Sequence, residues 1–304
     1  MITGLSGSVL SINHSNHVKP TLGAHISISG GLDKALLRGF SVGCDAIAIF
    51  SASPRVWKRR VPDDTSIARF TKARMETRIS IVILHAPYLV NLASTSHHLI
   101  ERSVHTMLHE IHFAAEYGIE WIVLHPGSST DGKMLTATKR VASHLNRLFE
   151  RTEHLSSVKI ALETTSGSGT DVGGKFEYLG EILMDLNNSN RIGICLDTCH
   201  VFASGYDVRN HLVWQDTYRR LINTTGIDKP ALLHLNDSQG DLNSHLDRHE
   251  HIGKGKIGLD GFKAILSDSR LSGVPMILET PKDKAGSFDK ENLKTLRALL
   301  NEIS

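Results

Sequence analysis

The chain has 304 residues, of which 40% are hydrophobic, and it carries 34 basic and 32 acidic side chains. This composition excludes disordered, collagen-like and low-complexity proteins, and no apolar run reaches the roughly 18 residues of a membrane-spanning helix. A net charge of +2 indicates no nucleic-acid binding without a local basic patch, and three cysteines are too few for a disulfide framework. We therefore expect an intracellular protein, cytoplasmic or, in a eukaryote, nuclear or organellar.

Residues 1–20 form a separate segment, which is rich in Ser, Asn, His and Gly and has no hydrophobic period. It has neither the long apolar stretch of a secretory signal nor the arginines of a transit peptide. No Pro/Gly/Ser-rich linker divides the rest of the chain. We expect an irregular extension over residues 1–20 and one folded domain over residues 21–304.

From residue 21 onward, short β-type runs alternate with amphipathic helical stretches such as 99–117 and 134–153. The predicted strands are residues 21–28, 45–50, 79–88, 121–126, 158–163, 192–197, 231–237 and 275–280. Several are nearly continuous in Ile, Val, Leu and Ala, which is typical of parallel strands buried on both faces. The alternation predicts an α/β fold, a single-domain (β/α)8 TIM barrel, with an open doubly wound sheet as the alternative.

The catalytic groups of a (β/α)8 barrel lie at the carboxyl ends of its strands. The predicted strands end at or beside a series of His, Asp and Glu residues: His25, His85, His125, Glu163, Asp197, His234 and Glu279. Only the second strand, which ends at Phe50 and Ser51, breaks this series. Buried carboxylates and imidazoles are costly unless they are paired or bind metal. We expect a metal centre here, with a purely structural polar network as the alternative.

Two further segments add ligands to this set. His200 follows Asp197 by three residues, and Asp247 and His249 alternate within the long segment 238–258, which we expect to be irregular. Side chains two residues apart in an extended segment point the same way, so both can bind one ion. Nine strong candidates are too many for one ion and about right for three: His85, His125, Glu163, Asp197, His200, His234, Asp247, His249 and Glu279. Mixed imidazole and carboxylate ligands favour Zn²⁺ or Mn²⁺ over Mg²⁺ or Ca²⁺.

Two motif-like segments fail on inspection. Residues 169–175 fit the first seven positions of a phosphate-binding P-loop, but Phe176 stands where that motif needs Ser or Thr. Residues 109–113 miss the zinc-protease pattern, because Phe113 replaces its second His. We expect three nearby histidines to line an exposed helix face: His105, His109 and His112.

A basic segment follows the second predicted strand. Residues 53–60 have the sequence Ser-Pro-Arg-Val-Trp-Lys-Arg-Arg, with four cations around one indole. A run of charged residues usually forms a solvated surface without a binding role. This loop, however, is expected at the same end of the barrel as the metals. There the cations can meet phosphates, and Arg55 or Trp57 can stack on bases. Tyr88, three residues after His85, is similarly placed, so we expect contact with nucleic acid.

Seven short segments together resemble the endonuclease IV family of apurinic/apyrimidinic (AP) endonucleases, also called AP endonuclease family 2. They are residues 23–27 (GAHIS), 125–127 (HPG), 162–165 (LETT), 196–200 (LDTCH), 234–238 (HLNDS), 247–249 (DRH) and 278–280 (LET). The order and number of these segments make the joint match specific, from about Leu22 to the carboxyl terminus. Residues 1–20 lie outside the resemblance.

The resemblance implies a (β/α)8 barrel that holds three zinc ions through the residues selected above. By similarity, the ligand sets are His85, His125 and Glu163; Glu163, Asp197, His234 and Glu279; and His200, Asp247 and His249. Glu163 and Glu279 are the implied catalytic residues. Family members insert side chains into the duplex, and the matching positions here are Arg55, Tyr88 and Leu89. His25 matches a family motif without being a zinc ligand, so we expect it to line the pocket.

The implied reaction is zinc-dependent hydrolysis of the phosphodiester 5′ to an abasic site in double-stranded DNA, as in base excision DNA repair. It leaves a 3′-hydroxyl and a 5′-deoxyribose phosphate, which is the chemistry of a deoxyribonuclease IV. An abasic nucleotide has no base to unstack, so flipping it into a pocket is cheap. We expect a monomer that uses no membrane and no nucleotide cofactor. The alternatives are a metal-dependent TIM-barrel sugar isomerase or epimerase, which needs only one or two ions, and a non-catalytic DNA-lesion binder.

Overall fold

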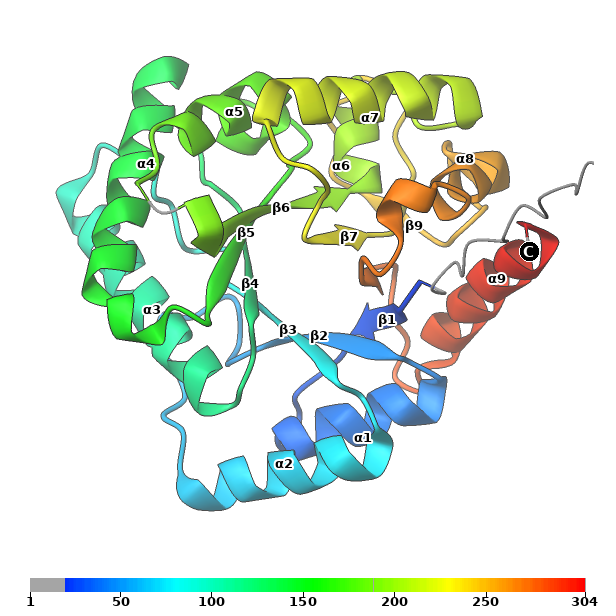
Figure 1. The fold of residues 1–304 in the computed structure, drawn as a ribbon, viewed down its shortest axis with the longest axis horizontal. Coiled ribbons are helices and arrows are strands. Elements are labelled where there is room, and N and C mark those ends of the chain that lie inside the picture. Colours follow the sequence, from blue (N-terminus) through cyan, green and yellow to red (C-terminus); the bar gives the residue numbers. More distant parts are fainter. Residues whose placement is uncertain (1–19, 188, 304) are drawn as a thin grey trace, which may run out of the picture.

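The computed structural model describes residues 20–187 and 189–303, and in it eight parallel strands close into a barrel in the order β1-β10-β7-β6-β5-β4-β3-β2 (Figure 1). The strands are β1 (Leu22–His25), β2 (Ala46–Phe50), β3 (Ile81–His85), β4 (Trp121–Leu124), β5 (Lys159–Glu163), β6 (Ile192–Asp197), β7 (Leu232–His234) and β10 (Met276–Leu278). The predicted single-domain barrel is confirmed, and the open doubly wound sheet is excluded. The expected extension lies outside the described residues, except for its last residue, Pro20.

Helices connect the strands and form the outer ring seen in Figure 1. They are α1 (Leu32–Val42), α2 (Asp64–Thr77), α3 (His97–Glu116), α4 (Met134–Arg151), α5 (Phe176–Met184), α6 (Thr198–Ala203), α7 (His211–Thr225), α8 (Gly258–Leu266) and α9 (Ser287–Ile303). Short 3₁₀ helices lie at Glu153–Leu155, Val172–Gly174, Ser189–Arg191 and Ser269–Leu271. In the described part of the chain, no helix is both long enough and apolar enough to cross a membrane.

The long segment after β7 is more ordered than expected. Its start pairs with its middle as a small antiparallel sheet of β8 (Asp237–Ser238) and β9 (His249–Glu250). This pairing brings the residues before α8 back towards the mouth of the barrel, because Ser238 and His249 stand opposite each other.

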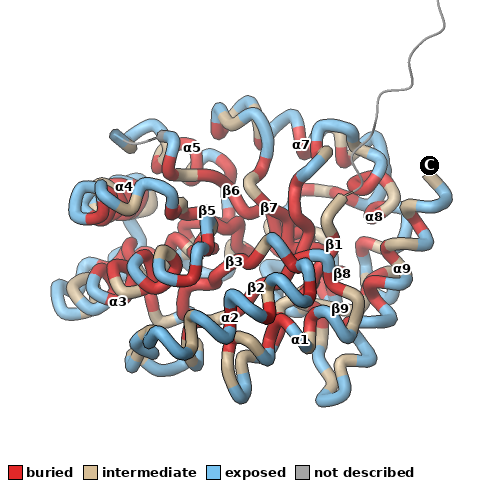
Figure 2. The backbone as a smooth tube through the Cα atoms, turned by 60° about the horizontal axis from the view of Figure 1, so that its bottom comes forward, coloured by how far each residue is buried: buried red, intermediate tan, exposed pale blue. Residues whose placement is uncertain are grey.

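Every barrel strand except β1 alternates between two apolar layers. Residues such as Ile47, Leu84 and Leu162 belong to the large cluster that the strands share with the helices. The barrel interior is filled by a separate set of buried residues: Ala46, Ala48, Ile83, Val123, Ala161, Cys195, Leu232 and Ile277. Figure 2 shows the strands buried inside helices whose outer faces are exposed. Burial on both faces explains why the strands have nearly continuous apolar sequences.

The strands are shorter than the runs predicted from sequence. Pairing in β3, for example, stops at His85 rather than at Tyr88, and the chain then turns away from the sheet. Polar side chains consequently stand at the carboxyl edge of the barrel. The last residues of their strands include His25, His85, Glu163, Asp197 and His234, while His125 and Glu279 come directly after theirs.

Gly23 in β1 marks a close approach between two strands. A Cβ here would lie 1.9 Å from the carbonyl oxygen of Ala46 in β2. We expect Gly23→Ala to lower the free energy of unfolding by about 2–3 kcal/mol, the usual cost of overpacking a core. In the control Gly273→Ala, the new Cβ would have nothing within 4 Å, so only backbone strain of about 1 kcal/mol is expected. Urea unfolding measures both variants, and equal losses would contradict the steric explanation.

Candidate metal centre

The side chains expected at the metal centre lie in one layer of the barrel. Six of the seven strand-end residues come two positions after a residue of the barrel interior, as Glu163 does after Ala161. Because successive strand side chains alternate between faces, these six face the interior as well. His25 reaches the same layer, since its Nδ1 lies 2.8 Å from Oε1 of Glu279. The barrel geometry therefore brings together residues from almost the whole length of the chain.

The first ligand group consists of His85, His125 and Glu163. Glu163 is fully buried, and its Oε2 lies 3.2 Å from Nε2 of His85 and 2.9 Å from Nε2 of His125. Nδ1 of His85 donates to the carbonyl of Ala86 at 2.7 Å. This bond fixes the tautomer and leaves the Nε2 lone pair facing the centre.

The other oxygen of Glu163 belongs to a second group, which Asp197, His234 and Glu279 complete. Oε1 of Glu163 lies 2.7 Å from Nδ1 of His234, and the same nitrogen lies 3.2 Å from Oε2 of Glu279. The four ligand atoms all lie within 4.8 Å of one another. Glu163 thus spans two adjacent groups with its two oxygens.

The third group consists of His200 from α6, His249 from β9, and Asp247, which lies just before β9. Each imidazole donates Nδ1–H to a backbone carbonyl, His200 at 2.8 Å and His249 at 3.1 Å. In the neutral imidazoles both Nε2 atoms carry lone pairs, and these atoms lie 3.4 Å apart and 3.2 and 3.4 Å from Oδ1 of Asp247. Three acceptor atoms this close need a positive charge between them, either a proton or a metal ion. The donor set of this group fits a metal ion.

The carboxylates make the centre favourable for positive charge. Burial would raise the pKa of Glu163, but the imidazoles of His234 and His125 hold that pKa well below its usual range. Burial would also lower the pKa of His200, but Asp197 and Asp247 raise it well above its ordinary value. A cluster that draws protons onto its imidazoles has the negative potential that a divalent cation requires.

Asn236 supports two ligands and was not predicted from the sequence. Its amide nitrogen donates to Oδ2 of Asp197 at 2.6 Å, and its Oδ1 accepts from the backbone N–H of Glu279 at 2.7 Å. Such hydrogen bonds orient metal ligands. Asn236 comes two residues after His234. The two-residue period of the strand could therefore have identified it from the sequence.

Two buried cysteines lie beside the ligand groups. Sγ of Cys195 lies within 4.8 Å of ligand atoms of Glu163 and His234, and burial raises the pKa of this thiol to about 12. Sγ of Cys199 donates to the carbonyl of Arg248 at 3.6 Å. Both side chains are fully buried and pack in the core.

The four residues expected to contact DNA differ in exposure. Arg55 is exposed, and Leu89 and Trp57 are half-buried. Tyr88 is 55% exposed, and its ring centroid lies 5.6 Å from that of His125. The guanidinium of Arg102 covers one face of the Trp57 ring at 4.4 Å. That face is therefore not available for stacking on a base.

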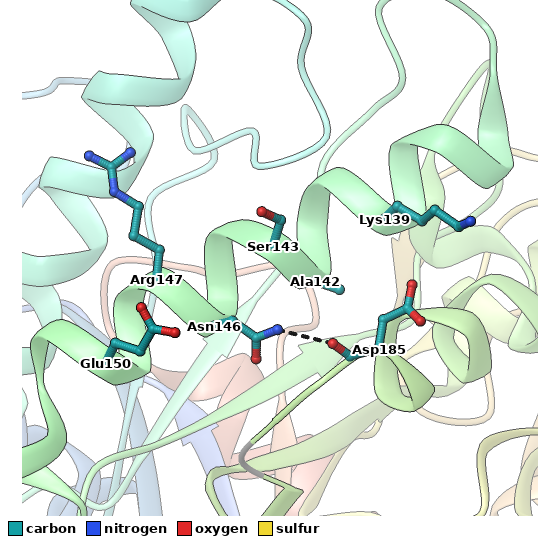
Figure 3. Close-up of a pocket in the computed structure, with 7 residues that line it drawn as sticks. All are labelled: Lys139, Ala142, Ser143, Asn146, Arg147, Glu150 and Asp185. Atoms are coloured by element: carbon teal, nitrogen blue, oxygen red, sulfur yellow. Dashed lines mark hydrogen bonds between the residues drawn. The ribbon is translucent and has the colours of Figure 1, made fainter.

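A cavity opens beside the first and third ligand groups. Residues in its wall include Tyr88, Asn91, His125, Ser128, Ser166 and Asp247. Another hollow lies on the outer ring of helices, where Asn146 of α4 donates to the carbonyl of Asp185 after α5 at 3.0 Å (Figure 3). Its lining contains no histidine or cysteine. The candidate chemistry therefore belongs to the cavity at the carboxyl end of the barrel.

Comparison with known proteins agrees with this picture. The xylose isomerase-like TIM barrel family matches residues 39–303. A curated protein of Chloroflexus aggregans, named "Probable endonuclease 4", is 40% identical over 281 residues, covering 92% of this chain and 98% of that protein. The crystal structure of endonuclease IV from Thermus thermophilus is 34% identical with a TM-score of 0.82, covering 93% of this chain and 100% of that one. A D-tagatose 3-epimerase-like protein, 21% identical with a TM-score of 0.71 over 93% of this chain and 98% of its own, shows the fold alone.

Proposed function

The chain belongs to the endonuclease IV family within the xylose isomerase-like TIM barrels, and on this premise we propose that it cuts double-stranded DNA at abasic sites with three zinc ions. Family membership makes it a nuclease and therefore a hydrolase. The proposed reaction hydrolyses the phosphodiester 5′ to the lesion and leaves a 3′-hydroxyl and a 5′-deoxyribose phosphate. The observation that supports this most directly is a set of five overlapping groups of potential ligands among the described residues, three of which consist of His, Asp and Glu alone.

The nine residues of these three groups would hold the ions. Their mixture of imidazoles and carboxylates suits Zn²⁺, with Mn²⁺ as a possible substitute. Bound divalent ions lower the pKa of water to near 7 and neutralise charge on a phosphate. The third group favours three ions rather than two, because its two imidazoles and its carboxylate together make a further set of potential ligand atoms.

Two carboxylates have distinct proposed roles. Glu163 fixes the spacing of the first two groups, because its oxygens face different imidazoles. Glu279 orients the attacking water. Its Oε1 accepts from His25 at 2.8 Å, and its Oε2 lies 3.2 Å from His234. Burial would raise the pKa of Glu279, but His234 and His25 hold it well below its usual range, which keeps this carboxylate an acceptor.

Substrate recognition is assigned to the rim of the cavity. Tyr88 lines the cavity and is 55% exposed, Leu89 follows it in the chain, and Arg55 is exposed in the loop after β2, so these three are the proposed contacts with the duplex at the lesion. Trp57 contributes through the face that Arg102 leaves free. An abasic nucleotide has no base to unstack, which lowers the cost of moving it into the cavity. One chain contains every proposed site residue, so a monomer suffices for the reaction.

A duplex oligonucleotide with a single abasic site tests the proposal. Zinc-loaded protein is expected to cut at the lesion and to leave the matching undamaged duplex intact. The upstream fragment should be extended by a DNA polymerase, because it ends in a 3′-hydroxyl. Elemental analysis should find about three metal ions per chain. Tight binding without cleavage would instead support a lesion binder, and one or two ions with turnover of a ketose would support a sugar epimerase.

A further inference from the structure

Glu110 is a buried carboxylate that the ligand groups and the proposed mechanism do not use. It lies in α3 on the buried face that also carries Met107, Ile111 and Ala114, and its side chain is 0% exposed. Burial raises its pKa to about 7, and its Oε2 has no hydrogen-bond partner among the described residues. Burying a carboxylate costs several kcal/mol even when it is paired, so stability alone does not account for it.

Oε1 of Glu110 accepts two hydrogen bonds from the chain that follows β2. Oγ of Ser51 donates at 2.8 Å, and Nη1 of Arg59 donates at 3.4 Å. Ser51 is 1% exposed and comes directly after Phe50, at the one strand end that lacks an ionisable residue. Ser51 is in the opposite phase to Ala46 and Ala48, which fill the barrel interior, so Glu110 meets the end of β2 on its helix side.

Arg59 turns inward, unlike the other three cations of the basic segment. Its side chain is 5% exposed, whereas Arg55, Lys58 and Arg60 are exposed. The guanidinium of Arg59 also donates to three backbone carbonyls of its own loop: those of Ser53, Val56 and Trp57. Arg59 is therefore occupied inside the loop and is not placed to meet a phosphate.

The loop has little backbone structure of its own. Over residues 52–62, the described chain has only one backbone–backbone hydrogen bond, from the N–H of Val56 to the carbonyl of Ser53 at 3.4 Å. α3 makes a second contact with the loop through Arg102, which covers the Trp57 ring. Glu110 thus links both ends of this loop to a well-packed helix, Ser51 at 2.8 Å and Arg59 at 3.4 Å.

We propose that Arg59 and Glu110 are positioning residues that hold the DNA-contact loop, residues 51–60, in the shape that presents Arg55 to the substrate. The inference rests on the proposed function, because the task assigned to the loop is contact with abasic DNA. Glu110 is 0% exposed and Arg59 is 5% exposed, so neither is placed to touch DNA, and neither belongs to a ligand group. Their loss therefore affects formation of the enzyme–substrate complex and not the chemical step.

Steady-state cleavage of the abasic duplex tests this inference. Arg59→Ala and Glu110→Ala are each expected to raise KM about 10-fold or more and to leave kcat within about 3-fold of the wild type, because misplaced contact groups weaken binding. The two residues act as one unit, so the double variant should be no worse than the worse single variant. Glu110→Gln keeps an acceptor oxygen for Ser51 and Arg59, and it should restore most of the wild-type KM.

Lys72→Ala is the charge-matched control. It removes a 75% exposed cation of α2, outside the basic segment, and we expect KM to change by about 3-fold or less. A KM as high as that of Arg59→Ala would overturn the proposal, because loss of charge would then explain both variants. Additive effects in the double variant, or a parallel loss of kcat and bound metal, would overturn it as well.

Amide hydrogen exchange of residues 51–60, followed by mass spectrometry, tests the positioning without any cleavage. Exchange should be faster in Arg59→Ala and Glu110→Ala than in the wild type or Lys72→Ala, and equal exchange would contradict the inference. If the wild-type protein leaves the abasic duplex uncut, the proposed function fails while the exchange experiment still decides whether the pair orders the loop. Should Glu110→Ala not fold, Arg59→Ala and Glu110→Gln supply the same test.

Discussion

Glu163→Gln is expected to lower kcat on an abasic duplex by at least about 10³-fold and to reduce the number of bound metal ions. Glu163 offers Oε2 to His85 and His125 and Oε1 to His234. Glutamine keeps one oxygen but replaces the other with an amide nitrogen that does not bind metal. Losing a ligand shared by two groups removes several kcal/mol of charge stabilisation, and each 1.36 kcal/mol corresponds to a tenfold change in rate.

Single-turnover cleavage and elemental analysis on the same preparation measure both effects. Glu120→Gln is the matched control, since Glu120 precedes β4 at the opposite end of the barrel. Its side chain is 56% exposed and pairs with Lys159 at 2.8 Å. An exposed pair of this kind contributes little, so kcat and metal content should match the wild type. Normal metal content and near-normal kcat in Glu163→Gln would show that Glu163 does not bridge the groups.

The fold was predictable because each strand carries its own signal. A run such as residues 192–196 is apolar throughout, since Ile194 packs against the helices while Cys195 fills the barrel interior. The ends of the runs were less predictable. Residues 86–88 are as apolar as a strand, yet they lie in a loop, because pairing with β4 stops at His85.

Most of the candidate centre follows from the same two-residue period. Glu163, Asp197 and His234 continue the inward phase of Ala161, Cys195 and Leu232. A barrel closes in a fixed strand order, so a residue in this phase at a strand end must lie near its counterparts on neighbouring strands.

The pairing of Glu110 with Arg59 could not be predicted from the two-residue period of the strands. The two residues are 51 positions apart, and nothing in the local sequence shows which of four neighbouring cations turns inward. Glu110 itself carried a signal, because it shares the apolar stripe of Met107, Ile111 and Ala114 on α3. An acidic residue in a buried helical phase needs a buried partner, and this rule identifies the residue without identifying the partner.

Glu279→Gln should separate catalysis from binding. We expect kcat to fall about 10³-fold, a loss within the range for a positioned acid or base, while the Kd for an abasic duplex stays within about 3-fold of the wild type. The backbone of Glu279 contacts Asn236 and His249 through its N–H and its carbonyl. Those bonds do not depend on the side chain, so the third ligand group should keep its geometry in the variant.

Fluorescence anisotropy with a labelled abasic duplex measures Kd, and single-turnover cleavage measures the chemical step. Glu291→Gln, on the exposed surface of α9, makes the same acid-to-amide change away from the centre and should leave both unchanged. Near-normal turnover in Glu279→Gln would show that this carboxylate does not orient the water. Joint loss of DNA binding and of bound metal would instead make Glu279 a ligand without a separate catalytic role, because its side chain would then act only by holding the second group together.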